Sequence, residues 1–344
     1  MSNSVFHSRR YIAIIIALAI ALVIMFCSRE RKRFWTDEGI IWTTEYHITY
    51  ESNRQLTDSI TAILTAIDNS VSPYNKESLI TRINNNTTQE ADSLFCKLYN
   101  VSLAINSGSQ GSFDPTVMPL VNAWGFGYKT GSLPSQRQID SLLTFVGITK
   151  THLKEKTIIK EDPRIQFDFS SIAKGFACDE IGRMLKRNGA SNFVIEIGGE
   201  VVAYGVNSRG ETWHVSVDLP QDEDSAVSHQ PTLILGLSKR AVATSGNYRK
   251  FKIVDGKKVS HIIDPKTGLS SQSNLLSATI VAPDCMTADA WATACMVMGT
   301  ERVKQLSDTH QDLGIMTITA DSLGNYVVWA NETFTKLVIQ VPSQ

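Results

Sequence analysis

Residues 193–206 read FVIEIGGEVVAYGV, with strand-like apolar runs on both sides of the Gly198-Gly199 pair. Short apolar runs bounded by glycines are typical of β-strands. Further strand-like runs follow toward the C-terminus, at residues 213–219, 233–237, 251–254, 314–319 and 326–329. The C-terminal half of the chain is therefore predicted to be rich in strands.

Helical periodicity dominates elsewhere. Apolar residues recur at helical spacing within residues 56–71, 94–105, 172–185 and 286–298. The first of these helices is predicted to stop before Pro73, and the third at Asn188-Gly189. Strands are predicted at residues 46–50 and 165–169, and a short helix after the late one. Helices and strands mix without strict βαβ alternation, which predicts an α+β fold rather than a doubly wound sheet.

Composition narrows the classes of function. The chain has 344 residues, 42% hydrophobic and 19% charged, enough for one large domain or two packed lobes. Its net charge is −1 and no concentrated basic face stands out beyond the first 33 residues, so nucleic acid is not an expected partner. The five cysteines are widely spaced without a CxxC pair, which predicts neither a zinc site nor a dense disulfide framework.

The N-terminus carries a separate signal. Residues 11–27 are uncharged and have basic residues on both flanks, and their length is at the short end of what spans a bilayer core of about 30 Å. A cleaved signal peptide is one alternative, although no A-x-A-like cleavage site is visible. A lipoprotein signal is another, although Phe26 stands before Cys27 where a small residue is expected. We predict a membrane anchor and basic linker in residues 1–40, outside the fold, and one functional domain in residues 41–344.

Two segments in the middle of the chain combine glycine with polar side chains. Residues 109–116 place Ser112, Phe113 and Asp114 in a glycine-containing loop, which can approach a ring-shaped ligand closely or be a plain Asp-Pro turn. Residues 168–175 read DFSSIAKG at the start of a predicted helix. A helix N-terminus with Lys174 suits a phosphate group, although Asp168 and Ser170 can equally be helix caps and the spacing is not that of a Walker A motif.

Two later segments carry other candidate groups. His261 stands just before the turn at residues 264–268, where a histidine can act as a general base near neutral pH, although a lone histidine is more often structural. Asp289 and Thr293 are four residues apart on a predicted helix, so their oxygens project from one face. Such oxygens suit Mg²⁺; an aspartate favoured by the helix dipole is the alternative.

Together these motifs carry a family resemblance. The order GSFDPTV, WGFG, DFSSIAKG, IGGE, ATSGNY, HIIDPKTG and ADAWAT is similar to that of the FAD:protein FMN transferase family, the ApbE-type flavin transferases, over residues 42–299. The resemblance implies an α+β, T-fold-like core that binds FAD and Mg²⁺ between its lobes. Members of this family usually act outside the cytoplasmic membrane, often as lipoproteins. The resemblance therefore implies an anchored protein with its catalytic domain on the extracytoplasmic face.

The resemblance assigns roles residue by residue. Contacts to FAD are implied for Tyr74, Ser112, Phe113, Asp114, Asp168, Lys174 and Ile263. Metal binding is implied for Asp289, Thr293 and the main-chain carbonyl of Ser171, and a catalytic part for His261 and Lys174.

The chain departs from the family pattern at three positions. Trp42 stands where a flavin-contacting methionine is expected, which leaves a contact through stacking. Asn247 replaces a commoner acid. Ala292 replaces an aspartate that adds to the metal site in some members, so a weaker metal site or a water at that position is expected.

The reaction implied is transfer of the FMN half of FAD to a threonine or serine hydroxyl of a target protein, such as a membrane redox subunit, with release of AMP. Mg²⁺ would neutralise the pyrophosphate. An FAD pyrophosphatase that gives FMN and AMP would use the same site, and a non-catalytic flavin-binding surface protein is the alternative of another class.

Overall fold

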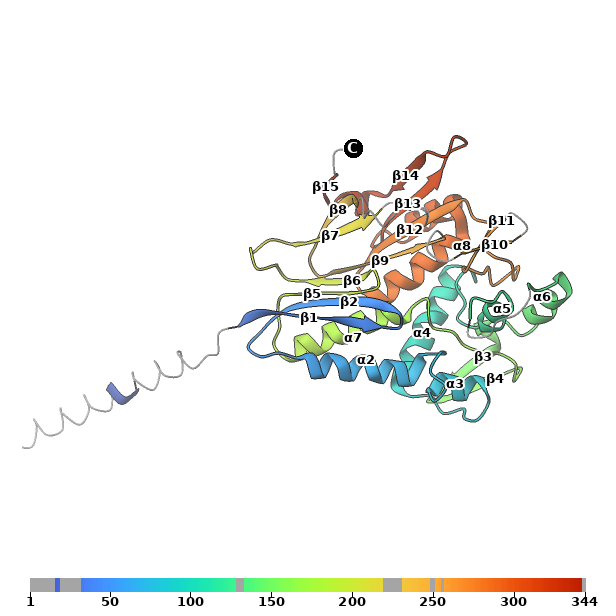
Figure 1. Ribbon diagram of the computed structural model, residues 1–344, viewed down its shortest axis with the longest axis horizontal. Helices are drawn as coiled ribbons and strands as arrows, with labels where there is room; N and C mark the ends of the chain where they lie inside the picture. The colour runs from blue at the N-terminus through green and yellow to red at the C-terminus, as the bar shows by residue number, and fades with distance from the viewer. Residues whose placement is uncertain are drawn as a thin grey trace, which may run out of the picture.

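The computed structural model describes residues 16–18, 32–127, 133–218, 231–247, 251–254 and 257–341 (Figure 1). The predicted anchor at residues 11–27 therefore lies outside the described residues except for 16–18, and Cys27 lies outside them as well. Within the described residues, no helix has the length and apolar character needed to cross a bilayer.

An eight-stranded sheet forms the centre of the molecule, in the order β1-β2-β5-β6-β9-β12-β13-β14. All of its neighbouring strands are antiparallel. The strands are β1 (Arg33–Ile41), β2 (Thr44–Ser52), β5 (Phe193–Ile197), β6 (Glu200–Tyr204), β9 (Arg240–Gly246), β12 (Leu275–Ala282), β13 (Gly314–Ala320) and β14 (Tyr326–Ala330). The predicted α+β class is confirmed, while β1, β9 and β12 are absent from the sequence prediction.

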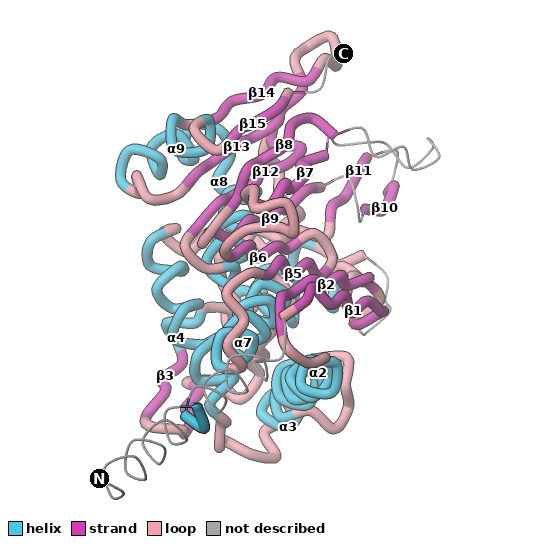
Figure 2. The backbone as a smooth tube through the Cα atoms, turned by 90° about the vertical axis from the view of Figure 1, so that its left-hand side faces the viewer, coloured by secondary structure: helices cyan, strands magenta, loops and turns pink. Residues whose placement is uncertain are grey.

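Helices cover one face of this sheet, and a small second sheet covers part of the other (Figures 1 and 2). The main helices are α2 (Thr57–Val71), α3 (Leu79–Asn84), α4 (Ser93–Gly108), α7 (Ala173–Arg187) and α8 (Cys285–Thr309). The second sheet has the order β15-β8-β7, with β7 (Trp213–Asp218), β8 (Pro231–Leu237) and β15 (Val338–Gln340). Its apolar side chains pack on β6, β9, β12 and β13 together with Phe334 of α9 (Glu332–Thr335).

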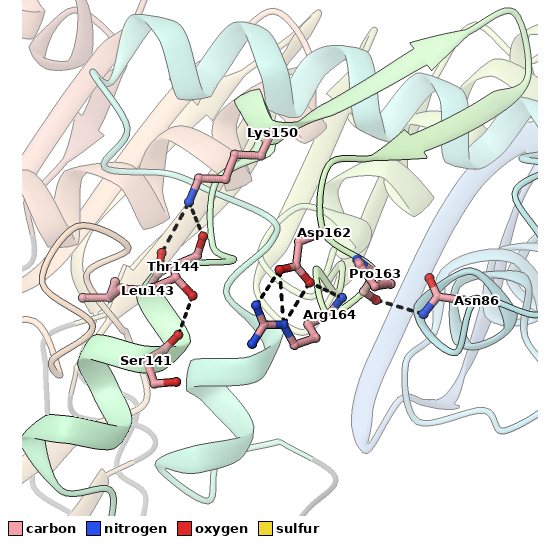
Figure 3. A network of polar contacts seen from close by, with 8 residues as sticks. All are labelled: Asn86, Ser141, Leu143, Thr144, Lys150, Asp162, Pro163 and Arg164. Carbon is pink, nitrogen blue, oxygen red and sulfur yellow. Dashed lines mark hydrogen bonds and ion pairs between the residues drawn. The ribbon is translucent and has the colours of Figure 1, made fainter.

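A smaller third cluster of buried residues, formed by Leu120, Ile139, Val146 and Ile263, lies at α5 (Met118–Ala123) and α6 (Gln136–Leu143). The remaining elements are η1 (Ile148–Lys150), β3 (Thr151–Lys154), β4 (Thr157–Lys160), β10 (Phe251–Val254) and β11 (Lys257–Ser260). Lys150 donates to the carbonyl of Thr144 (2.7 Å) at the end of α6, and the carbonyl of Pro163 accepts from Asn86 Nδ2 (2.9 Å; Figure 3). Side chains thus tie this outlying cluster to the main body.

The domain boundary predicted after residue 40 is wrong. Strand β1 pairs with β2 over its full length, from Arg33 opposite Ser52 to Ile41 opposite Thr44. The strand was not predicted because polar residues, Thr36-Asp37-Glu38, stand at its centre and break the pattern of apolar residues. The structure shows why it is stable there: Asp37 is buried, and its carboxylate accepts a hydrogen bond from the Tyr50 hydroxyl (2.7 Å).

The strand predicted at residues 165–169 is also wrong, since this segment contributes only an isolated bridge between Gln166 and Val117. Ile165, Phe167 and Phe169 are fully buried, which explains the strand-like pattern. The backbone is paired outside any sheet: the N–H of Phe167 donates to the Asn84 side chain (2.7 Å) and that of Asp168 to the carbonyl of Pro115 (2.6 Å).

The helix predictions are confirmed. α2 ends just before Pro73, α4 is capped by Asp92, and α7 is followed by Asn188 and by Gly189 at φ 79°. The predicted pair of late helices corresponds to α8, where Gly299 at φ 75° interrupts the helical backbone.

Candidate active site

One cavity of about 410 Å³ gathers every site residue predicted from the sequence. Its lining includes Trp42, Tyr74, Ser112, Phe113, Asp114, Asp168, Ser171, Lys174, His261, Ile263, Asp289 and Thr293. These residues come from segments far apart in the chain, so the fold brings them together. We divide them into two sets by the segments that carry them: a helix wall (Asp168, Ser171, Lys174, Glu200, Asp289 and Thr293) and a loop wall (Ser112, Phe113, Asp114, Phe126, His261 and Ile263).

The helix wall is built where α7 begins. Asp289 of α8 is 4% exposed, and its Oδ2 accepts a hydrogen bond from the N–H of Gly175 in the first turn of α7 (3.1 Å). Burial raises the pKa of Asp289, against the opposing effects of the Lys174 charge and the Gly175 hydrogen bond. Oδ1 of Asp289 receives no hydrogen bond from the described residues.

Lys174 forms an ion pair with Glu200, with 2.5 Å between Nζ and Oε2. Glu200 follows Gly198 and Gly199, whose φ angles of 62° and 100° make the tight turn between β5 and β6. The Glu200 side chain is almost fully buried. Glu200 stands in the IGGE motif, but sequence reasoning gave it no role, because only the fold reveals its lysine partner.

The hydroxyl of Thr293 lies one turn along α8 from Asp289, and its Oγ1 is 3.2 Å from Oγ of Ser245 on β9. Asp168, buried in the segment just before α7, accepts from the N–H of Ser170 (2.8 Å), and burial raises its pKa. No group of three or more His, Cys, Asp or Glu that could hold a metal occurs among the described residues. A cation held by Asp289 would need further ligands from hydroxyl and carbonyl oxygens and from the substrate, and such oxygens suit a hard cation such as Mg²⁺.

The loop wall is fixed by hydrogen bonds to Asp114. Its two carboxylate oxygens accept from the N–H (2.8 Å) and hydroxyl (2.6 Å) of Thr116, the N–H of Ile148 (2.9 Å) and the amide of Asn106 (3.0 Å). Burial raises the pKa of Asp114, while these four hydrogen bonds oppose that rise. Asp114 thus organises the loop that presents Ser112 and Phe113.

Arg302, on α8 beyond Gly299, supports the same loop. Its guanidinium donates to Oγ of Ser112 (2.9 Å) and to the carbonyl of Ser109 (2.9 Å). Arg302 is a residue that sequence reasoning missed, since its partners lie about 190 positions away.

His261 lies edge-to-face against Phe126, with ring centroids 6.4 Å apart. The turn that follows is closed by a hydrogen bond from the N–H of Gly268 to the carbonyl of Asp264 (2.8 Å). The indole of Trp124 donates to the carbonyl of Gly268 (2.8 Å), so the WGFG and HIIDPKTG motifs hold one another in place.

Trp42 occupies the rim of the cavity, in the two-residue turn between β1 and β2. Trp42 and Thr43 have φ angles of 49° and 65°, as a type I′ turn requires, although neither is glycine. The indole donates to the Asp68 carboxylate (2.9 Å), which fixes the ring at the rim. Tyr74 lies exposed at the same cavity.

The other two departures from the family pattern lie in different surroundings. Asn247 donates from its side chain to the carbonyl of Leu275 (2.9 Å) and so ties the end of β9 to β12. Ala292 is fully buried in the main core and is not among the described residues that line the cavity.

The fold that builds this cavity is that of the flavin transferases, as the likeness to solved structures shows. The structure is similar to the flavin transferase ApbE from Vibrio cholerae (TM-score 0.79, 29% identity, covering 89% of this chain and 99% of that one). It is also similar to the flavinyl transferase ApbE of Pseudomonas stutzeri (TM-score 0.79, 26% identity, 89% and 97%).

The chain belongs to the ApbE family, whose model matches residues 42–317. It is 33% identical to the FAD:protein FMN transferase of Haemophilus influenzae over 96% of this chain and 98% of that protein. It is 31% identical to the enzyme of the same name from Escherichia coli K12, over 88% and 87%.

Proposed function

We propose that this protein transfers the FMN moiety of FAD to a hydroxyl side chain of a target protein and releases AMP. The names of its relatives support this activity. The single observation that carries it is the cavity, which brings together groups that suit a pyrophosphate and groups that suit an aromatic ring.

The helix wall suits the pyrophosphate. The N-terminus of α7 carries the positive end of the helix dipole, and Lys174 at its second position adds a full charge. The ion pair with Glu200 holds Lys174 in place before the anion arrives. The loop wall, with Phe113, Phe126 and His261, offers aromatic surface to the flavin rings.

Asp289, Thr293 and the carbonyl of Ser171 would hold Mg²⁺. The ion would neutralise charge on the pyrophosphate. The structure fits this assignment because Oδ1 of the buried Asp289 receives no hydrogen bond from the described residues, and because the lining oxygens are of the type that Mg²⁺ prefers.

The reaction is a phosphoryl-type transfer. The hydroxyl oxygen of a target threonine or serine attacks the FMN-side phosphorus, a new P–O bond forms, and the bond from that phosphorus to the AMP oxygen breaks. His261 is the candidate base for the hydroxyl proton, since it lines the same cavity as the groups of the helix wall. Lys174 stabilises negative charge on the departing AMP.

The setting is part of the proposal. Residues 11–27 would anchor the chain in the cytoplasmic membrane, with the domain on the extracytoplasmic face and membrane redox subunits among its targets. Lipidation of Cys27 is the alternative form of attachment.

A direct test mixes the full-length protein with FAD, Mg²⁺ and a flavin-accepting partner and looks for a fluorescent protein band on a denaturing gel. We expect a band on the partner and stoichiometric AMP. AMP and FMN without a band would identify the pyrophosphatase instead, since water would be the nucleophile. FAD binding without any AMP would identify a flavin-binding protein. A partner in which the acceptor hydroxyl is replaced by alanine is the matched control.

A further inference from the structure

Helices α7 and α8 cap one another. Asp179 of α7 accepts hydrogen bonds from the first two N–H groups of α8, those of Cys285 (3.0 Å, to Oδ1) and Met286 (2.9 Å, to Oδ2). In return, Asp289 of α8 accepts from the N–H of Gly175 in the first turn of α7. Each helix therefore supplies a buried carboxylate to N–H groups that the other helix leaves unpaired.

The two helices also touch through their backbones. A Cβ atom at Gly175 would lie 2.3 Å from the carbonyl oxygen of Cys285 and 2.9 Å from Cβ of Asp289. Such an approach is open only to glycine. Any slide of α8 along α7 would break all three reciprocal hydrogen bonds, so the contact fixes one relative position of the helices.

We infer that Asp179 is a positioning residue for the active site. By holding the first turn of α8 on α7, Asp179 sets where Asp289 and Thr293 lie relative to Lys174. Asp179 is not among the described residues that line the cavity. Its effect on ligand binding rests on the proposed function, whereas its effect on the two helices does not.

A carboxylate is required at residue 179 because two neighbouring N–H groups each need an acceptor. Asparagine has one acceptor oxygen and an NH₂ group, so Asp179→Asn would leave a donor facing a donor. Asp284 offers a matched control at the same helix end. Its side chain caps α8 through a single N–H, that of Thr287 (2.9 Å), which asparagine can also accept.

The test is hydrogen exchange by mass spectrometry on the full-length protein, followed through peptides that cover residues 172–180 and 284–292. Asp179→Asn should speed exchange about tenfold in both peptides, because the caps are reciprocal. Asp284→Asn should change exchange less than about twofold in either peptide. Faster exchange in the α8 peptide alone would reduce Asp179 to an ordinary cap and overturn the inference.

FAD affinity, measured by fluorescence quenching, gives the second readout. We expect Asp179→Asn to weaken it about tenfold and Asp284→Asn to leave it unchanged. Unchanged affinity in Asp179→Asn, with α7 and α8 both loosened, would also overturn the positioning role. Failure of the unsubstituted protein to bind FAD would count against the proposed function, and the exchange data would still decide the capping. Should Asp179→Asn not fold, Asp289→Ala, which removes the acceptor of the Gly175 N–H, tests the same coupling from the other side, with faster exchange expected at residues 285–286.

Discussion

The helix wall and the loop wall of the cavity differ in how the fold supports them. The helix wall stands on α7 and α8, whose inner faces belong to the largest apolar core of the protein. The loop wall shares that core through Phe113, but its other support is a small cluster formed by Leu120, Ile139, Val146 and Ile263, with hydrogen bonds to Asp114 and Gly268. Because local stability follows the extent of buried contacts, the loop wall should be less rigid than the helix wall.

This difference matches the ligand proposed for each wall. A pyrophosphate and a cation need fixed charges, since electrostatic stabilisation depends on groups that are already in place. A flavin ring and an incoming protein segment instead need a surface that can open and close. Five predictions test the contrast, from the largest expected effect to the smallest.

Asp289→Ala should produce the largest loss. Removal of the one buried carboxylate proposed for the cation should lower the rate of AMP release at least about 10³-fold, equivalent to about 4 kcal/mol of transition-state stabilisation. AMP chromatography under Mg²⁺ measures the rate. Asp308→Ala removes an exposed aspartate from the same helix and is the control. Full activity in Asp289→Ala would remove the metal assignment.

His261→Ala should slow transfer about 10²-fold while FAD affinity changes less than about threefold, as expected for a general base. Single-turnover transfer with FAD saturating separates the two effects. His214→Ala, at an exposed position on β7, is the control. Equal losses in binding and in turnover would make His261 a part of the ring surface and place the base elsewhere.

Gly175→Ala and Gly182→Ala form a matched pair on α7, and they should change the free energy of unfolding in opposite directions. At Gly175 the new methyl group would meet the Cys285 backbone at 2.3 Å, so we expect a loss of about 2–3 kcal/mol in the free energy of unfolding, together with loss of FAD binding. At Gly182 its closest neighbour would be Phe193 at 3.4 Å, so the helix propensity of alanine should stabilise by about 0.5 kcal/mol. Urea unfolding measures both. Similar effects at the two positions would contradict the close helix contact.

Stability against pH should reveal the buried carboxyl of Asp179. Burial raises its pKa to about 7, so between pH 4 and pH 7 the folded protein binds this proton more tightly than the unfolded chain. The free energy of unfolding from this group therefore falls as pH rises, by at most about 1.4 kcal/mol per pH unit. From pH 5 to pH 7 the free energy of unfolding should fall in the unsubstituted protein relative to Asp179→Asn, because the variant lacks this titrating group. A difference that does not vary with pH would show that the carboxyl titrates normally.

Trp124→Phe should have the smallest effect and act locally. It removes the hydrogen bond to the Gly268 carbonyl, worth about 1 kcal/mol, and should speed exchange in residues 261–269 while global stability falls little. Trp213→Phe removes the analogous bond to the Tyr204 carbonyl (3.0 Å) between two sheets and is the matched control. Local loosening confined to the Trp213 variant would reverse the proposed contrast between the walls.

Sequence patterns predicted the α+β class and the helices α2, α4, α7 and α8, because apolar periodicity and caps such as Asn188-Gly189 are local properties. They failed where burial came from tertiary contacts. Residues 165–169 look like a strand because they are buried, yet their N–H groups bond to a side chain and to a loop carbonyl. β1 was missed for the opposite reason, since the partner of its buried Asp37 is Tyr50 of the neighbouring strand.

The residues of the candidate site also divide into those that could be predicted from the sequence and those that could not. Asp289 and Thr293 could be paired from helical spacing, and the other site residues from the family resemblance. Asp179, Glu200 and Arg302 could not be assigned, because each acts on residues that only the fold brings near. Glu200 stands inside the quoted IGGE motif and Asp179 four residues beyond DFSSIAKG, but neither position indicates its partner.

Strand β1 sets the distance between the cavity and the start of the folded chain. It runs from Arg33 to Ile41, Trp42 of the cavity follows it directly, and an extended chain of that length spans about 30 Å. Since β1 is paired along its whole length, it acts as a rigid spacer between residue 32 and the rim. The rim thus lies about 30 Å along the sheet from residue 32, which in the proposed function is the side of the anchor. A target protein would have to bring its acceptor hydroxyl to the rim, at that distance from residue 32.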